Sequence, residues 1–181
     1  PSVTGGAGAT PLEASYSAWR ASSRGADVDR GNPASVYRFL YGRLTLSFRG
    51  RQIQGGPARR PTMTLFWHRR DLRLADNRGL AAAADDGPVR PVFVFDDEVL
   101  THGSDARVRF MLDALAALRE QYRERESDLI IAHGDPATVL PALAAAVDAE
   151  TIHWNEDYTK LSRDRDARVR LALERAGVDR E

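Results

Sequence analysis

The stretch Thr64-Leu-Phe-Trp-His-Arg-Arg-Asp-Leu-Arg-Leu-Ala-Asp-Asn77 passes abruptly from an apolar run into a loop dense in charge. The apolar run, residues 65–67, predicts a short buried strand. The charged residues would then form the loop at the carboxyl end of that strand, which is where open α/β sheets bind their ligands. The stretch therefore predicts both the first strand of a sheet and a candidate ligand site.

Strand-like and helix-like patterns alternate along the rest of the chain from Met63 onward. We expect strands over residues 65–67, 89–95, 129–132 and 151–154, and helices over residues 77–84, 105–125, 136–147 and 162–176. Asp76 is the expected N-cap of the first helix, and Gly177 is expected to end the last one. This order predicts an α/β fold, a Rossmann-like doubly wound parallel sheet in a three-layer αβα arrangement.

The two ends of the chain differ from this pattern. Residues 1–62 carry nine Arg against three acidic residues, a formal charge of +6, whereas residues 63–181 carry 17 basic against 23 acidic residues, or −6. We interpret residues 1–62 as a basic arm of low order, extraneous to the domain at 63–181; a native arm is the alternative. The chain stops where a fifth strand would begin, so the domain is expected to be truncated after its fourth helix.

Several classes of protein are disfavoured by what the sequence lacks. It has no cysteine, hence no disulfide, thiolate zinc site or cysteine nucleophile. It has no apolar run of about 18 residues and no secretory signal, so we expect a cytoplasmic protein. Glycine-rich phosphate loops, a Gly-x-Ser-x-Gly elbow and a metal-spaced histidine pair are also missing. The sequence therefore predicts no catalytic residue and no metal site.

Two charge-rich segments follow the first and fourth predicted strands, at residues 68–73 and 155–160, and the second continues into residues 163–168. Because the strands of a parallel sheet end at one edge, both segments can face the same crevice. Charge is costly to bury unless it is paired. Two alternatives remain open: an internal network of ion pairs, or a polar, planar or anionic ligand between the segments.

Four segments resemble landmarks of one known family. They are Phe66-Trp-His-Arg-Arg-Asp-Leu-Arg-Leu74 with Asp76-Asn77, Asp105-Ala-Arg-Val-Arg-Phe-Met-Leu112, His133-Gly-Asp-Pro136, and Trp154-Asn-Glu-Asp-Tyr158 with Arg163-Asp-Arg-Asp166. In this order they are similar to the N-terminal domain of the DNA photolyase and cryptochrome family. The resemblance extends from Met63 to about Val178.

This resemblance implies the light-harvesting antenna domain of a deoxyribodipyrimidine photolyase, an enzyme that repairs UV-induced cyclobutane pyrimidine dimers with blue or near-UV light. In the family, FAD and the catalytic site belong to a C-terminal helical domain that these residues do not include. The fragment alone is expected to be inactive, and the complete protein to bind UV-damaged DNA as a monomer. The alternatives are a cryptochrome photoreceptor and a nucleotide-binding domain of the universal-stress or electron-transfer-flavoprotein type, which shares the α/β layout.

The resemblance also implies an antenna pigment. Members with similar motifs bind 8-hydroxy-5-deazaflavin, and the positions that match its contacts are Arg70, Phe93, Asp157 and Arg165. Phe93 would offer an apolar plane, and the charged residues would form hydrogen bonds. Thr159 departs from the carboxylate usual at its position. Methenyltetrahydrofolate is the weaker choice, because Leu161-Ser162 replaces the Asn-Glu pair of folate-binding members.

Overall fold

The structure, a computed structural model, describes residues 62–100 and 104–181. All but Thr62 of the predicted basic arm, residues 1–62, therefore lies outside the described residues. Within those residues, no helix is long and apolar enough to cross a membrane.

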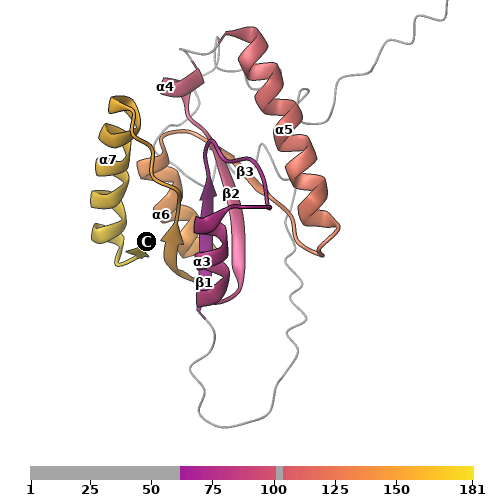
Figure 1. Ribbon diagram of the computed structural model, residues 1–181. Helices are drawn as coiled ribbons and strands as arrows, with labels where there is room; N and C mark the ends of the chain where they lie inside the picture. Colours follow the sequence, from indigo (N-terminus) through magenta and orange to yellow (C-terminus); the bar gives the residue numbers. More distant parts are fainter. Residues whose placement is uncertain (1–61, 101–103) are drawn as a thin grey trace, which may run out of the picture.

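In the described part of the chain, five parallel strands form one sheet in the order β3-β2-β1-β4-β5 (Figure 1). They are β1 (Met63–His68), β2 (Val89–Phe95), β3 (Ile130–His133), β4 (Ala149–His153) and β5 (Asp179–Arg180). The chain adds β2 and β3 on one side of β1 and then crosses to add β4 and β5 on the other. This reversal makes the carboxyl ends of β1 and β4 the topological switch point, where ligands bind in open α/β sheets. The predicted doubly wound parallel sheet is confirmed.

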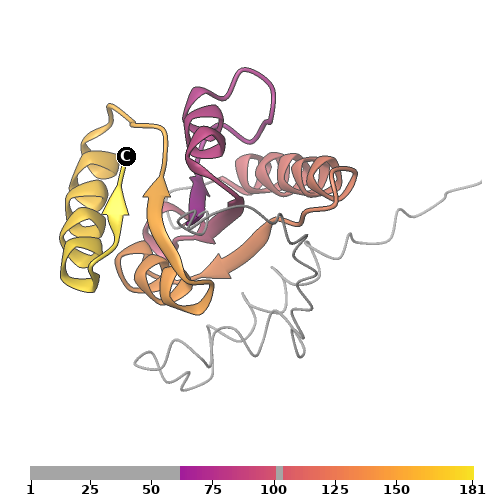
Figure 2. The same ribbon diagram turned by 90° about the horizontal axis from the view of Figure 1, so that it is seen from below.

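Within residues 62–100 and 104–181, five helices accompany the strands: α3 (Arg78–Asp86), α4 (Asp97–Leu100), α5 (Asp105–Arg123), α6 (Pro136–Ala146) and α7 (Lys160–Ala176). Helices α6 and α7 cover one face of the sheet, and α3 and α5 cover the other (Figure 2). The two faces follow from the alternation of side chains along each strand. On β2, Val92 and Val94 belong to the core under α6 and α7, whereas Phe93 and Phe95 pack against α5.

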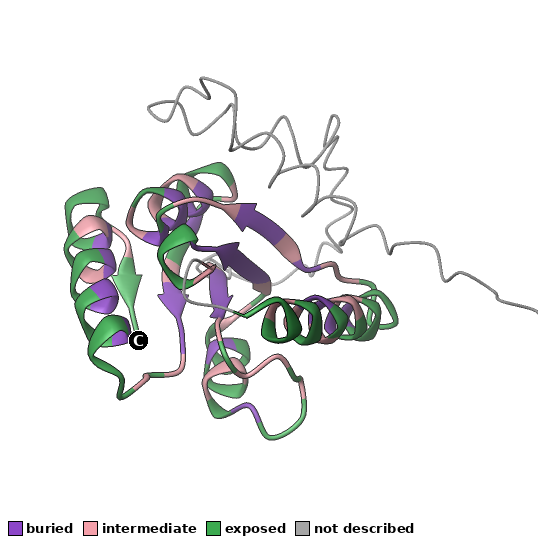
Figure 3. Ribbon diagram, turned by 90° about the horizontal axis from the view of Figure 1, so that it is seen from above, coloured by how far each residue is buried: buried purple, intermediate pink, exposed green. Residues whose placement is uncertain are grey.

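The two cores lie between the sheet and its helices, so that buried residues follow strands β1 to β4 and the inner sides of α3, α5, α6 and α7 (Figure 3). Helix α7 shows this division over three residues. Leu173 is fully buried in the first core, whereas Leu171 is 48% exposed on the outer surface of the same helix. The apolar periodicity of α7 therefore matches the face that it buries.

The ends of the helices differ in part from the predictions. Asn77, not Asp76, caps α3: its side chain accepts a hydrogen bond from the Leu80 N–H, while Asp76 has a left-handed φ of 54°. An N-cap needs an extended backbone, which Asn77 has and Asp76 lacks. Helix α4, a single turn, was not predicted. Asp135 caps α6, and Gly177 ends α7 in a left-handed conformation that favours glycine, as expected.

The cores yield a first testable expectation. Leu173→Ala should lower the free energy of unfolding by about 2 to 5 kcal/mol, because it removes a fully buried side chain from the core under α7. Leu171→Ala, two residues away on the exposed side, is the matched control and should change it by about 0.5 kcal/mol or less. Urea denaturation of both variants measures the difference. Equal losses would mean that α7 is packed differently.

Candidate functional site

A cleft of about 340 Å³ lies at the switch point. One wall is formed by the end of β1 and the loop after it, residues 66–71, and the other by the loop after β4, residues 155–158. These are the two charge-rich segments of the sequence, and the structure confirms that they face one crevice.

Asn155 joins the two walls of the cleft through three hydrogen bonds. Its side-chain amide donates to the carboxylate of Asp71 (3.1 Å) and to the side-chain oxygen of Asn77 (3.0 Å). Its own side-chain oxygen accepts from the backbone N–H of Gly79 (3.2 Å). Since every polar group of this amide is used within the protein, Asn155 holds the loop after β4 against the start of α3.

Below the cleft lies a buried charge cluster, consisting of Arg69, Asp96, Arg165 and Asp166. Arg69 donates to Asp166 at 2.8 Å, with both side chains only 6% exposed. Arg165 lies 3.5 Å from Asp96 and 3.9 Å from Asp166, and both partners are also buried. The cluster is neutral overall, which limits the cost of removing four charges from water.

Trp67 lies close to both arginines of this cluster. The guanidinium carbons of Arg69 and Arg165 are 5.0 and 5.1 Å from the centre of its ring system, within the range of cation–π attraction. Burial is the main cause that lowers the pKa of Arg165, and repulsion from Arg69 adds to it; Asp96 and Asp166 oppose both effects. The positive charges are therefore held by an aromatic ring as well as by carboxylates.

Hydrogen-bonding capacity is left over in the cluster. Arg69 Nε and Nη2, Arg165 Nε, Asp96 Oδ2 and Asp166 Oδ1 are buried without a hydrogen-bond partner. Arg69 also lines the cleft. Buried polar atoms are normally satisfied, so unused N–H groups beside a cleft indicate a place where a polar ligand or water can bind.

Arg70, the next residue along the loop, has a different environment. Its side chain is 62% exposed, and it pairs with Asp157 at 3.1 Å across the cleft. Its guanidinium carbon lies 5.7 Å from the ring centre of Tyr158, which is 81% exposed. An accessible cation and an accessible aromatic ring thus lie together at the mouth of the cleft.

Asp157 is mostly buried and has further partners at the start of α7. It accepts hydrogen bonds from the Ser162 hydroxyl at 2.8 Å and from the Thr159 N–H at 3.3 Å. Burial alone would raise the pKa of Asp157, but the hydrogen bonds from Ser162 and Thr159 and the charge of Arg70 lower it below its ordinary value. Asp157 is therefore an ionised carboxylate that also shapes the loop.

His68 is enclosed behind the same wall. Its Nδ1 lies 3.1 Å from the backbone oxygen of Asp71, and its Nε2 lies 2.7 Å from the hydroxyl of Tyr122. A carbonyl oxygen can only accept, so Nδ1 carries the proton and Nε2 accepts from Tyr122. Burial lowers the pKa of His68 to about 4, which keeps the ring neutral at pH 7.

The four residues proposed to contact a pigment are divided by the structure. Arg70 and Asp157 meet at the cleft. Arg165 lies in the buried charge cluster, and Phe93 packs edge-on against Phe95, with 5.1 Å between ring centres, on the face covered by α5. Phe93 does not line the cleft.

Sequence reasoning missed several residues that shape this site. The individual roles of Arg69, Asp96, Asn155 and Asp166 were not predicted. Asp96 directly follows β2, so its position at the same sheet edge could have been recognised. Which of the adjacent Arg69 and Arg70 turns inward is decided by tertiary packing, and no sequence signal reveals it.

Comparisons with known proteins show to which family the chain belongs. A family model described as DNA photolyase matches residues 64–181. The chain is 63% identical over 126 residues to a deoxyribodipyrimidine photo-lyase of Halobacterium salinarum, covering 64% of this chain and 26% of that protein. It is 42% identical over 117 residues to one of a Synechococcus species, covering 63% and 24%. The chain thus spans about a quarter of the length of these curated relatives.

A solved structure shows the same arrangement. The crystal structure of an archaeal photolyase from Sulfolobus tokodaii, described with two FAD molecules, superposes with a TM-score of 0.61 at 34% identity, covering 66% of this chain and 28% of that one. The fold defines an α/β domain of the photolyase type. The chain belongs to the DNA photolyase family. The resemblance read from the sequence is confirmed, and a universal-stress or electron-transfer-flavoprotein domain is not supported.

The environment of His68 predicts a pH-dependent stability. Its folded pKa of about 4 lies below the ordinary 6.5, so between these values the unfolded chain binds more protons than the folded one. Stability should therefore fall as the pH drops from 6.5 to 4, by about 3 kcal/mol more than in His68→Gln, which cannot titrate. Denaturant unfolding at several pH values measures the free energy of unfolding of both proteins. The other titrating groups are the same in both, so their contributions cancel when the two values are subtracted. If the free energy of unfolding fell equally with pH in the two proteins, His68 would not be the group responsible.

The buried charge cluster predicts a large effect of losing one member. Arg165→Met should lower the free energy of unfolding by about 3 kcal/mol, because it leaves Asp96 buried without its cation. Arg168→Met, one turn further along α7, removes an exposed pair with Glu98 and should cost about 1 kcal/mol or less. Thermal and urea denaturation compare the two variants. A small loss for Arg165→Met would show that the cluster does not hold α7 in place.

Proposed function

We propose that this chain is the antenna-binding domain of a deoxyribodipyrimidine photolyase, the enzyme that uses blue or near-UV light to repair cyclobutane pyrimidine dimers in DNA. The observation that carries the proposal is the cleft at the β1 and β4 switch point, where Arg70, Asp157 and Tyr158 converge. It occurs in a chain that belongs to the DNA photolyase family and is 63% identical to a photolyase.

The residues of the cleft fit an antenna pigment. Its volume of about 340 Å³ is within the range of small-molecule sites. Arg70 and Asp157 would hydrogen-bond the polar edge of the pigment, and Tyr158 offers an aromatic plane. The pigment would supply absorption of light, and the protein would supply its position and exclude water from one side.

The pigment we propose first is 8-hydroxy-5-deazaflavin, with methenyltetrahydrofolate second. The archaeal photolyase of Sulfolobus tokodaii is described with two FAD molecules and the implication of a novel light-harvesting cofactor, which supports a flavin-like ring as the pigment. Arg70 and Asp157 would contact the ring. Arg165 would act indirectly, by holding Trp67 and α7, and Phe93 would reach the pigment only if its packing against Phe95 opened.

The complete protein would bind FAD in its C-terminal domain, act as a monomer on UV-damaged DNA and work in the cytoplasm. Repair is favoured over a cryptochrome function because the relatives with 63% and 42% identity are photolyases. The test is to express the longest reading frame that contains this chain in photolyase-deficient cells. Survival after UV should rise in blue light and not in the dark; equal survival would exclude repair.

Binding of the pigment should depend on Arg70 itself and not merely on the positive charge of the loop after β1. Arg70→Ala should weaken binding of 8-hydroxy-5-deazaflavin by about tenfold, since it removes an accessible charged hydrogen-bond donor. Arg73→Ala is the matched control, because Arg73 is in the same loop and equally exposed, at 61%, but does not line the cleft. Absorbance and fluorescence titrations of the purified chain measure affinity, and thermal unfolding confirms that both variants are folded.

The comparison of pigments decides between the two candidates. If methenyltetrahydrofolate binds and 8-hydroxy-5-deazaflavin does not, the folate is the antenna pigment, and the cleft is still the antenna site. If neither binds to the folded chain, or if both variants bind alike, the cleft is not an antenna site.

A further inference from the structure

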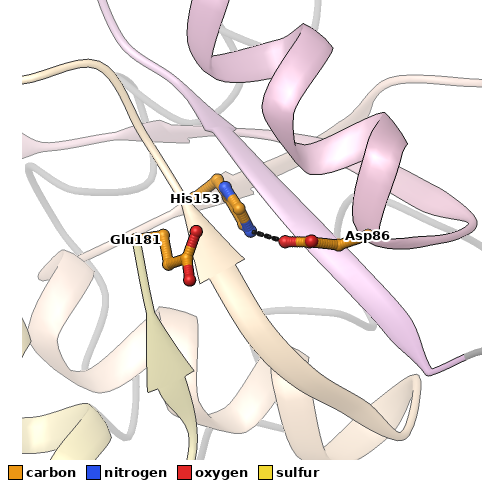
Figure 4. Close-up of side chains that lie close together, drawn as sticks. All are labelled: Asp86, His153 and Glu181. Atoms are coloured by element: carbon orange, nitrogen blue, oxygen red, sulfur yellow. Dashed lines mark ion pairs between the residues drawn. The ribbon is translucent and has the colours of Figure 1, made fainter.

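Away from the cleft, three side chains from distant parts of the sequence converge at the β5 edge of the sheet (Figure 4). Asp86 is the last residue of α3, His153 is the last residue of β4, and Glu181 follows β5. One potential ligand atom from each residue lies within 4.8 Å of the others. No residue of this group lines the cleft or belongs to the buried charge cluster.

His153 is the fixed member of the group. Its side chain is 3% exposed, and its Nε2 atom points toward the Asp86 carboxylate at 2.9 Å. That approach does not have the geometry of a hydrogen bond, and Nε2 has no other hydrogen-bond partner. A buried ring nitrogen without a hydrogen bond is costly, and a cation bound to its lone pair would satisfy it.

The two carboxylates are placed by the backbone but are free to adjust. Glu181 is anchored beside His153 by two backbone hydrogen bonds with β4: its N–H donates to Ile152 (3.1 Å), and its carbonyl accepts from Trp154 (3.3 Å). Asp86 and Glu181 are both exposed to solvent. Ligands of a tetrahedral zinc ion lie about 3.3 to 3.5 Å apart. Asp86, at 2.9 Å from His153, would have to move slightly away from the imidazole, and the widest separation in the group would have to shorten by at most about 1.4 Å. Exposed carboxylate side chains can make both adjustments.

We propose that Asp86, His153 and Glu181 form a site for a divalent transition metal ion, zinc in the first instance. One imidazole and two carboxylates form a ligand set suited to zinc, with a fourth position left for water. Magnesium and calcium prefer ligand sets made of oxygen alone. The ion would tie the end of α3 and the short edge strand β5 to β4. The sequence predicted no metal site, because the three residues are far apart in the chain.

The competing explanation is a simple ion pair between a protonated His153 and Asp86, with Glu181 nearby by chance. The two explanations differ in what Glu181 does. An ion pair needs only Asp86, whereas a metal site needs both carboxylates and responds to added zinc.

The test is a calorimetric titration of the purified chain with Zn²⁺ alone, followed by Co²⁺ as a spectroscopic probe of nitrogen and oxygen ligation. The variants are Asp86→Asn and Glu181→Gln, which keep the size and fold. Their matched controls are Asp85→Asn, which removes the neighbouring charge on α3, and Asp179→Asn, which removes a charge on β5. Thermal unfolding with and without Zn²⁺ gives a second readout.

We expect one Zn²⁺ per chain, bound at least about tenfold more weakly in each of Asp86→Asn and Glu181→Gln and unchanged in the controls. Zinc at a hundred times its dissociation constant should raise Tm by about 5 °C or more, and much less in the two variants. Absence of stoichiometric binding, or equal binding by variants and controls, would overturn the proposal. A loss of metal-free stability in Asp86→Asn, without zinc binding by the parent chain, would establish the ion pair instead. None of these outcomes bears on the antenna proposal.

Discussion

The interaction on which the site depends is the buried salt bridge between Arg69 and Asp166, at 2.8 Å. It connects the loop after β1 to the second turn of α7, and Arg165 and Asp96 extend it to the end of β2. A buried charge that loses its partner is strongly unfavourable, so these groups permit few positions of α7 relative to the strand ends. Since the cleft wall at residues 155–158 leads directly into α7, the cluster also fixes the width of the cleft.

Above this cluster, the shape of the cleft depends on a close approach between Asn155 and the backbone of α3 as much as on charge. The Asn155 side chain accepts from the Gly79 N–H, and a Cβ atom at position 79 would collide with the Asn155 oxygen. A side chain at this position would therefore push the Asn155 amide out of its place, which favours glycine in the first turn of α3. Because Asn155 also binds Asp71 and Asn77, one side chain aligns the start of α3 with both loops, and the walls cannot move independently.

The sequence was sufficient for the sheet and its layers because these depend on periodic patterns. Strand β2 was predicted at its observed bounds, and Gly177 was recognised as the end of α7. The site was predicted less fully because it depends on tertiary contacts. Phe93 was assigned to the pigment because the family resemblance implies it, whereas strand alternation directs its side chain toward α5. The group around His153 arises from the pairing of β4 with β5 and from the length of α3, which no local pattern specifies.

The adjacent Arg69 and Arg70 show why a conspicuous motif does not identify a binding residue by itself. Both were expected to occupy the charged loop, but their side chains are 6% and 62% exposed. Arg69 balances a buried carboxylate and lies beside Trp67, whereas Arg70 reaches Asp157 and Tyr158 at the mouth of the cleft. The two alternatives left open by the sequence, an internal ion-pair network and a ligand site, are thus compatible. The ion pairs hold Arg69 inward, and this geometry leaves Arg70 accessible to a ligand.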